Sequence, residues 1–508
     1  MKLDPQSCSR LLQAGSPMKL YGKVTKVVGL VAEGSGLRAP LGAVCHMMPS
    51  EDSEGIAAEV VGFRDGNLLF MPYGDMRGIR PGSRIRNTSL PPVFPVGPEL
   101  LGRAFDAFGT PLDSGPAIST ELCASPLAQT SEGKADFAAQ MEAQRPFTPQ
   151  WIMDARREWH PELGSLYADP PNPLQRPRIT DILDVGVRAI NGLITLGKGQ
   201  RVGIMAGSGV GKSTLMGMMA RYTKADVNVI GLIGERGREV LEFMERDLGP
   251  EGMARSVLVI ATSDQSPLVR MRAAYAATAV AEYFRDKGKD VLLMMDSVTR
   301  FAMAAREVGL AIGEPPTTKG YTPTVFAQLP KLLERAGRSS TGTITGVYTV
   351  LVDGDDFNEP IADAVRSILD GHIVLTRDLA DQGHFPAIDV LRSISRLRSD
   401  ICKRDDLMAG RAVLRSMSTY RKVEDMVNIG AYARGSNPEI DEAIIKMPLI
   451  NNFLRQEVAE KQDVESSMGL LHAIVDAPGT LPPPQEAPAA AQNKLQKVPP
   501  VPGGLRRG

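Results

Sequence analysis

Apolar positions change their spacing several times along the chain, and each change predicts a different kind of structure. Between about residues 19 and 93, short runs of alternating apolar and polar residues, such as 21–31 and 57–63, are separated by Gly, Asp and Pro. Alternation with a period of two is typical of strands with one buried face, and closing such strands into a barrel leaves no unpaired edge. The first part of the chain is therefore predicted to be a small β-barrel.

Two further patterns follow. From about residue 179 to 398, continuous apolar runs alternate with helical stretches, which is typical of an α/β domain with a mainly parallel sheet. The expected strands are residues 202–205, 227–233, 256–261, 291–295, 343–352 and 372–375. From about residue 399 to 476, apolar residues recur at helical spacing: Leu407, Val413, Leu414, Met417 and Val423. The pattern predicts a helical domain after the α/β core.

These changes divide the chain into expected parts. They are an N-terminal β-barrel domain with a short leading segment (1–98), a connector with an irregular insertion (99–173), the α/β domain (174–398), a C-terminal helical domain (399–476) and a disordered Pro/Ala-rich tail (477–508). The insertion, from about residue 116 to 173, contains both tryptophans, Trp151 and Trp159. Long segments without periodicity inside compact proteins are usually insertions or partly ordered loops. Its aromatic residues indicate either a partner contact or an ordinary loop.

The segment Ala-Gly-Ser-Gly-Val-Gly-Lys-Ser-Thr at residues 206–214 directly follows a predicted buried strand. A strand, a glycine-rich turn and a helix form a P-loop, in which backbone N–H groups and the helix N-terminus surround nucleotide phosphates. Lys212 is expected to reach the β- and γ-phosphates, and the Ser213 hydroxyl to bind Mg²⁺. The residues expected to hold the nucleotide are Gly207, Ser208, Gly209, Val210, Gly211, Lys212, Ser213 and Thr214. Ala206 replaces the first glycine of the strict motif, but the glycines of the turn remain.

Two carboxylates follow other predicted strands of the same domain. Asp296 ends the apolar run 291–295, and Glu235 lies in the segment Gly-Leu-Ile-Gly-Glu-Arg-Gly-Arg-Glu at residues 231–239. Ligands of parallel sheets bind beyond the carboxyl ends of the strands. Asp296 is therefore expected to hold Mg²⁺ through water, and Glu235 to polarise the water that attacks the γ-phosphate. The alternative for Glu235 is a place in a solvated cluster of ion pairs with the neighbouring charged residues.

Composition excludes several other classes. The formal net charge of −1 argues against a surface that coats nucleic acid, although a local basic patch would not be visible in the total. The 4 cysteines lie far apart, and the 5 histidines form no metal-ligand cluster. The first residues lack the apolar core of a signal peptide, and no apolar run approaches the length of a membrane span. We therefore expect a cytoplasmic protein without a disulfide framework or a structural zinc.

Together these motifs resemble the catalytic-subunit family of rotary and secretion ATPases, whose cores are RecA-like. The most specific marks are the Gly-Glu-Arg-Gly-Arg-Glu box at 234–239 and the segment Pro-Ala-Ile-Asp-Val-Leu-Arg-Ser-Ile-Ser at 386–395. Segments 313–321, 355–363 and 368–375 resemble the branch that powers flagellar and type III protein export, and segments 172–176, 220–223 and 317–319 favour its flagellar member. The resemblance implies an α/β RecA-like P-loop ATPase core between an N-terminal β-barrel and a C-terminal helical domain.

The resemblance also implies roles for single residues. Tyr348 matches the tyrosine that stacks on adenine, with ordinary packing within a strand as the alternative. Arg396 matches an arginine finger that reaches the nucleotide of the neighbouring subunit, with Arg366 as the alternative. Arg236 and Glu239 match positions that support the catalytic glutamate and the water network around the metal.

The resemblance further implies a function and partners. ATP, with Mg²⁺ as cofactor, is hydrolysed to release export substrates from chaperones, to unfold them and to deliver them to export-gate membrane proteins. The partners implied are other copies in a homohexamer, a peripheral stator or regulator protein, a central coiled-coil stalk protein and chaperone–substrate complexes, without nucleic acid. The implied location is cytoplasmic, with peripheral association at the inner membrane.

Three alternatives remain open at this point. An injectisome ATPase would share every catalytic residue named above. A proton-translocating ATP synthase subunit fits less well, because Gly237, Arg238 and the segment 355–363 match the export branch better. The third is a protein of another class: a RecA-fold nucleic-acid motor, or a subunit that binds a nucleotide without hydrolysing it. A non-catalytic subunit should lack a carboxylate at position 235, where this chain has Glu235.

Overall fold

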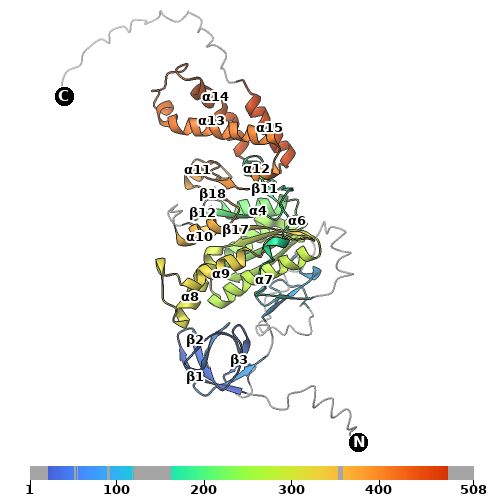
Figure 1. The fold of residues 1–508 in the computed structure, drawn as a ribbon, viewed down its shortest axis with the longest axis vertical. Helices are drawn as coiled ribbons and strands as arrows, with labels where there is room; N and C mark the ends of the chain where they lie inside the picture. The colour runs from blue at the N-terminus through green and yellow to red at the C-terminus, as the bar shows by residue number, and fades with distance from the viewer. Residues whose placement is uncertain are drawn as a thin grey trace, which may run out of the picture.

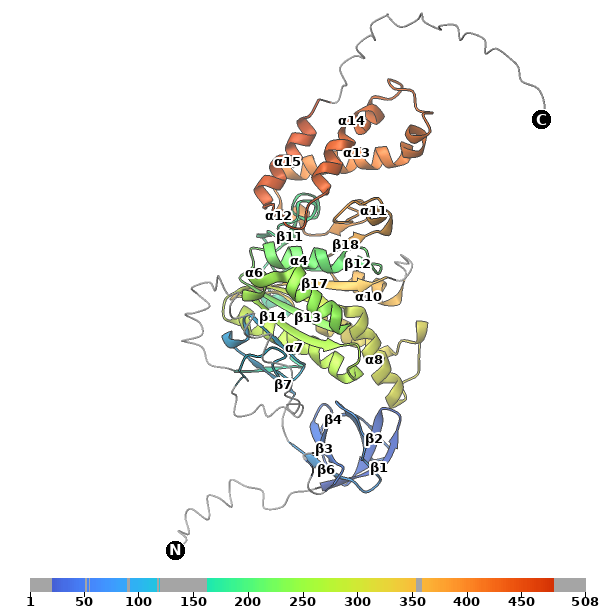
Figure 2. The same cartoon turned by 180° about the vertical axis from the view of Figure 1, so that it is seen from behind.

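The computed structural model describes residues 21–50, 53, 55–88, 92–116, 118, 162–352 and 359–478. Three parts follow one another along its long axis: a β-barrel at one end, an α/β core in the middle and helices α13 to α15 at the other end (Figures 1 and 2). The predicted leading segment (1–20), most of the insertion including Trp151 and Trp159, and residues 479–508 of the predicted tail lie outside the described residues. Within these residues, none of the helices combines the length and hydropathy needed to cross a bilayer.

The predicted barrel is present. Its strands are β1 (Tyr21–Val28), β2 (Val31–Ser35), β3 (Val44–Met48), β4 (Ile56–Arg64), β5 (Asn67–Pro72) and β6 (Arg84–Asn87). They close in the order β1-β2-β5-β4-β3-β6. Alternate side chains such as Val24, Phe70 and Ile85 fill the interior, as the period of two predicts.

A sheet of 9 strands forms the centre of the molecule, with β19-β18-β12-β17-β15-β13-β14-β8 as its order and β16 paired to β17. Its strands are β8 (Arg103–Phe105), β12 (Arg201–Ala206), β13 (Val227–Glu235), β14 (Ser256–Thr262), β15 (Asp290–Asp296), β16 (Gly337–Arg338), β17 (Thr343–Leu351), β18 (Gly371–Leu375) and β19 (Ile394–Ser395). All pairings are parallel except those of β16 and β19. Every strand predicted for the α/β domain is confirmed. The edge strand β8 was not predicted, because it comes from the segment assigned to the connector.

Helices cover both faces of this sheet. The helices of the core are α4 (Lys212–Tyr222), α5 (Gly237–Glu242), α6 (Gly249–Ala254), α7 (Pro267–Asp286), α8 (Val298–Ile312), α9 (Pro323–Leu333), α10 (Pro360–Ile368), α11 (Arg377–Asp381) and α12 (Arg398–Ile401). The helices α13 (Arg404–Asn428), α14 (Pro438–Leu454) and α15 (Val464–Asp476) form the separate C-terminal part. In β13, Val229 packs in the apolar cluster of α7 and α8, and Ile230 packs in the cluster of α4. Burial on both faces explains why the parallel strands are continuously apolar.

Short elements connect these parts. They are β7 (Val93–Val96) paired with β9 (Glu162–Ser165), and β10 (Ile182–Leu183) paired with β11 (Leu196–Gly197). Short 3-10 helices are η1 (Pro98–Leu100), η2 (Pro173–Gln175) and η5 (Thr318–Gly320), and short π-helices are η3 (Ile190–Ile194) and η4 (Phe243–Leu248). The pairing of β7 with β9 brings the residues just before the predicted connector beside the last part of the predicted insertion.

The C-terminal helices pack against the P-loop side of the core. Val413 of α13, Phe453 of α14 and Leu471 of α15 belong to the same apolar cluster as Met216 of α4. Within α13 only Ala409, Gly410 and Val413 are buried, so the predicted apolar face is narrower than its sequence pattern. One continuous cluster therefore joins the helical domain to the nucleotide-binding side of the sheet.

Candidate nucleotide and catalytic site

The P-loop has the predicted form. Strand β12 ends at Ala206, the turn follows, and α4 begins at Lys212. Gly209 has φ +78° and Gly211 has φ +90°, values that residues with a Cβ rarely adopt. Free N–H groups at the start of α4 face the end of the turn, which makes the segment suited to bind phosphate.

Lys212 lies between the two predicted carboxylates. Its Nζ is 2.5 Å from Oδ1 of Asp296 and 3.7 Å from Oε1 of Glu235. The three side chains are 5% to 15% exposed. Burial alone would lower the pKa of Lys212, but the charges of Asp296 and then Glu235 outweigh it and raise the pKa. The ends of three elements, α4, β13 and β15, thus place one cation and two anions in a shielded cluster.

Glu235 is poised to exchange a proton near neutral pH. Burial and then the nearby charge of Asp296 raise its pKa to about 7, against the opposing effect of Lys212. Glu239 raises it further through a side-chain hydrogen bond and its charge. A carboxyl group whose pKa lies close to the working pH is suited to act as a general base.

Asp296 is held in place by neutral and charged donors. Its Oδ1 accepts hydrogen bonds from Lys212 Nζ and, at 2.6 Å, from Thr349 Oγ1 of β17. Asp296 ends β15, and β15 lies between β13 and β17 in the sheet. Sequence reasoning did not identify Thr349, because alternation along a strand does not tell which of two neighbouring residues faces the ligand edge.

Arg236 and Glu239 lie beside the cluster. Arg236 is 81% exposed and its Nη1 is 3.7 Å from Oε1 of Glu239, one turn along the chain. Glu239 connects to the site through its hydrogen bond with Glu235, whereas Arg236 forms its ion pair with Glu239. The hydrogen bond with Glu235 supports the role predicted for Glu239. The role predicted for Arg236 remains a prediction.

Tyr348 does not join the other predicted site residues. Its side chain is 0% exposed inside the core, so no face is open for a base to stack on. Its ring packs back over Gly346, and its hydroxyl lies within electrostatic range of Arg201 at the start of β12, away from the P-loop. The structure therefore corrects the expected adenine contact, and supports the alternative of packing within the strand.

Phe385 is an aromatic residue that does lie at the P-loop. It is 47% exposed, and a Cβ placed on Gly211 would be 3.7 Å from Phe385 Cδ1. Sequence spacing gave no sign of this contact, because Phe385 is far from the P-loop along the chain. Arg377, in the same loop region after β18, donates a hydrogen bond of 3.0 Å to the Ser208 carbonyl oxygen.

Arg300 is a second residue that sequence reasoning missed. It lies in the first turn of α8, the helix that follows Asp296, and its Nε is buried without a hydrogen-bond partner among the described residues. Its side chain packs against Gly234: a Cβ there, at φ +73°, would lie 3.0 Å from Arg300 Cβ. The sequence could have indicated Arg300 by its position, one helical turn after Asp296 at the end of its strand.

Arg396 lies at the opposite edge of the sheet from Lys212. Its backbone N–H donates to the Asp370 carbonyl oxygen, and the Asp370 N–H donates to the carbonyl oxygen of Arg201, the first residue of β12. The 6 residues of β12, at about 3.3 Å per residue, therefore put roughly 15–20 Å between Arg396 and the P-loop. Arg366 lies at the same edge, since its carbonyl oxygen accepts a hydrogen bond of 3.3 Å from Arg396. Neither arginine is placed to serve the nucleotide site of its own chain.

The metal-binding residues predicted for this site, Ser213 and Asp296, offer one hydroxyl and one carboxylate. Such hard oxygen donors suit Mg²⁺, which keeps several waters and takes further oxygens from phosphate. The described residues contain no group of three or more His, Cys, Asp or Glu able to hold a metal by itself. The donor set therefore fits a Mg²⁺ ion that arrives with a nucleotide.

A P-loop after β12, a carboxylate at the end of β15 and a largely buried glutamate at the end of the adjacent β13 define a RecA-like P-loop ATPase. Comparison with known proteins agrees. Residues 186–395 match the nucleotide-binding domain of the ATP synthase alpha/beta family, residues 24–89 match the β-barrel domain of that family, and residues 402–473 match the C-terminal domain of the type III secretion ATPase EscN.

Individual relatives cover nearly the whole chain. The flagellum-specific ATP synthase of Bacillus subtilis is 50% identical, over 93% of this chain and 99% of the relative, and that of Salmonella typhimurium is 47% identical, over 90% and 94%. The type 3 secretion system ATPase of Xanthomonas euvesicatoria is 45% identical, over 90% and 94%. The assembled EscN from enteropathogenic Escherichia coli is 41% identical with a TM-score of 0.77, over 89% of this chain and 100% of that chain. The chain belongs to the ATP synthase alpha/beta family, in its branch of flagellar and type III secretion ATPases.

Proposed function

We propose that this ATPase hydrolyses ATP at the cluster of Lys212, Glu235 and Asp296. The P-loop residues 207–214 bind the phosphates, and Lys212 contacts the β- and γ-phosphates. Glu235 accepts a proton from the attacking water, which its pKa near 7 supports. Arg300, whose buried Nε has no partner in the described part of the chain, is a candidate for a further phosphate contact. The observation that carries the proposal is the position of Lys212, which joins both carboxylates at the end of the P-loop.

Ser213 and Asp296 would hold Mg²⁺ with the nucleotide. When bound, the ion neutralises charge that develops on the phosphate oxygens. Phe385 takes the place first assigned to Tyr348: its exposed ring beside Gly211 would stack on the adenine base. Glu239 would orient Glu235 through their hydrogen bond.

The pH dependence of hydrolysis tests the role of Glu235. Because the raised pKa keeps Glu235 protonated below about pH 7, kcat/KM for ATP should fall as the pH drops through 7 and reach a plateau above it. The measurement is a steady-state pH profile of kcat/KM on both sides of this value.

A matched variant separates Glu235 from ionisation of the substrate. Glu239→Gln removes a charge that raises the pKa of Glu235, so the acidic limb should move to lower pH. If the acidic fall in kcat/KM occurs at the same pH in Glu239→Gln as in the wild type, the titrating group is ATP rather than Glu235. A profile without an acidic fall would show that Glu235 is not the general base.

We further propose that hydrolysis energises flagellar type III protein export, with release of substrates from chaperones, their unfolding and their delivery to an export gate. The two flagellum-specific relatives, at 50% and 47% identity, support the flagellar system over the injectisome. Solved relatives are described as an assembled ATPase and as a complex with a central stalk, EscO. They support a homohexameric ring around a stalk protein for this chain. A peripheral stator protein and a peripheral position at the inner membrane complete the proposal.

Deletion of the gene in the cell of origin tests the export function. Flagellar subunits should disappear from the medium and the cells should stop swimming, and a plasmid copy of the wild-type gene should restore both. A copy with Lys212→Ala should restore neither, because the export step would lack ATP hydrolysis. Loss of injectisome secretion with intact swimming would instead assign the chain to the virulence system.

A further inference from the structure

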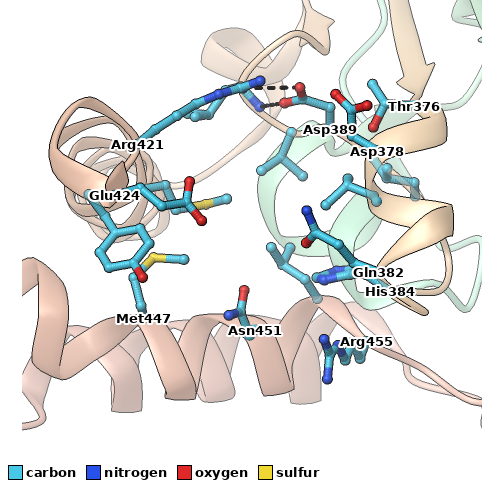
Figure 3. Close-up of a pocket in the computed structure, with 17 residues that line it drawn as sticks. Thr376, Asp378, Gln382, His384, Asp389, Arg421, Glu424, Met447, Asn451 and Arg455 are labelled. Atoms are coloured by element: carbon cyan, nitrogen blue, oxygen red, sulfur yellow. Dashed lines mark hydrogen bonds and ion pairs between the residues drawn. The ribbon is translucent and has the colours of Figure 1, made fainter. Parts of the chain in front are cut away.

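A cavity separates the loop region after β18 from the C-terminal helical domain (Figure 3). It encloses about 300 Å³. One side is formed by residues between Thr376 and Leu391, and the other by α13 and α14. The same loop region carries Phe385, and it continues through β19 to Arg396. A contact across this cavity therefore links the helical domain to the segment that runs from Phe385 to Arg396, two residues with proposed functions.

Two polar contacts bridge the helical domain and this segment. The Arg421 Nη1 group of α13 donates a hydrogen bond of 3.1 Å to Oδ2 of Asp389. Figure 3 shows this pair at one end of the cavity, with His384 and Arg455 at the other. There, the Gln456 N–H donates a hydrogen bond of 3.0 Å to the Phe385 carbonyl oxygen. The helical domain thus holds the segment beside Phe385 and again at Asp389.

Asp389 organises the turn between Phe385 and Arg396. Its Oδ1 accepts hydrogen bonds from the backbone N–H groups of Leu391, at 3.0 Å, and Arg392, at 3.2 Å. Its own carbonyl oxygen accepts a hydrogen bond of 2.7 Å from Ser393 Oγ, and its N–H donates to Val374 of β18. One oxygen of the carboxylate therefore fixes the turn, while the other faces the helical domain.

We propose that Arg421 is a positioning residue that couples α13 to the nucleotide site through Asp389. A displacement of α13 would move Asp389 and the turn built on it, and with them Phe385 towards or away from the P-loop and the strand that leads to Arg396. The proposal rests on the proposed functions of Phe385 and Arg396. It gives the helical domain a direct route to ATP affinity in its own subunit.

The exposure of the two partners favours a positioning role over a role in stability. The Arg421 side chain is 55% exposed, whereas that of Asp389 is 8% exposed. An exposed arginine contributes little free energy to folding. Without Arg421, Asp389 keeps its hydrogen bonds to Leu391 and Arg392. Loss of Arg421 should therefore leave the turn folded but no longer tied to α13.

Replacement of Arg421 tests the proposal. In purified protein, Arg421→Gln should raise KM for ATP by about 3- to 10-fold, the size typical of residues that carry coupling, with an unchanged melting temperature. Arg421→Lys should restore part of the affinity, because it keeps the positive charge. Arg415→Gln is the matched control, since Arg415 is an exposed arginine on the same helix outside the cavity lining. Equal KM values for Arg421→Gln and Arg415→Gln would overturn the proposal, as would a lower melting temperature that accounts for the change in KM.

A double-mutant cycle with Phe385→Ala gives a readout that a structural role would not produce. Arg421 acts through the segment that carries Phe385, so Arg421→Gln should change KM by less than about 2-fold once Phe385 is alanine. Fully additive changes would overturn the proposed route. An unchanged KM in Phe385→Ala alone would refute the base contact, and the comparison of Arg421→Gln with Arg415→Gln would then decide the role of Arg421.

Discussion

Replacement of Lys212 with alanine should abolish ATP hydrolysis. The variant loses the ammonium group that lies 2.5 Å from Asp296 and that is proposed to contact the transferred phosphate. Removal of one preorganised group that stabilises transition-state charge typically costs about 10²–10³ in rate, and Lys212 would also contribute to phosphate binding. We therefore expect a loss of at least about 10³ in kcat/KM for ATP. Release of inorganic phosphate from purified protein measures the effect.

The melting temperature of the same variant serves as its control. Lys212 is the cation between two buried carboxylates, and removal of one partner of a buried pair typically destabilises a protein by about 3–5 kcal/mol. Glu235 limits this loss, because removal of Lys212 also removes the charge that lowers the pKa of Glu235, so this carboxyl group can take up a proton. The variant should have a lower melting temperature than the wild type but should remain folded at the temperature of the assay. A folded Lys212→Ala protein with full activity would refute the P-loop assignment.

The sequence predicted the phosphate side of the site because that side depends on local order. Asp296 directly follows an apolar run, Glu235 follows another after one glycine, and Lys212 follows a third after the glycine-rich turn. Parallel strands bring such ends to one edge of the sheet, so three separate positions along the chain predicted one cluster. The distances of 2.5 Å and 3.7 Å from Lys212 to the two carboxylates bear out that they meet.

The base-binding side could not be predicted in the same way. Tyr348 and Thr349 are neighbours in β17, and successive side chains point to opposite faces of a strand. Only the packing of the sheet decides that Thr349 reaches Asp296 while Tyr348 is enclosed in the core. Phe385 lies in a loop that accepts hydrogen bonds from Gln456 and, at Asp389, from Arg421 of the helical domain. Contacts between residues so far apart in the chain leave no periodic trace in the sequence.

Two inactive variants should recover activity when they are mixed. Arg396→Ala keeps Lys212 and Glu235 in its own nucleotide site, and Glu235→Gln keeps an intact Arg396 to offer to a neighbour. An arginine that neutralises charge on the γ-phosphate is worth about 10³–10⁵ in rate, so each variant alone should be almost inactive. In rings assembled from equal amounts, about a quarter of the sites combine the Glu235 of one variant with the Arg396 of the other, since each condition is met half the time. The ATPase activity of mixtures reassembled at a range of ratios measures this recovery.

The opposite-edge position of Arg396 makes this test decisive. A strand length of roughly 15–20 Å separates Arg396 from the P-loop of its own chain, so we expect Arg396 to act on the nucleotide of a neighbouring subunit. Arg396→Ala mixed with the double variant Arg396→Ala/Glu235→Gln contains no intact Arg396 and should stay inactive. Arg366 shares the same edge through its carbonyl contact with Arg396, so Arg366→Ala is mixed with Glu235→Gln in parallel. Recovery in that mixture, combined with full activity of Arg396→Ala alone, would transfer the role to Arg366. If neither mixture recovers activity, neither Arg396 nor Arg366 acts on the nucleotide of a neighbouring subunit. Hydrolysis would then be completed within a single chain, and the proposed role of Arg396 would be refuted.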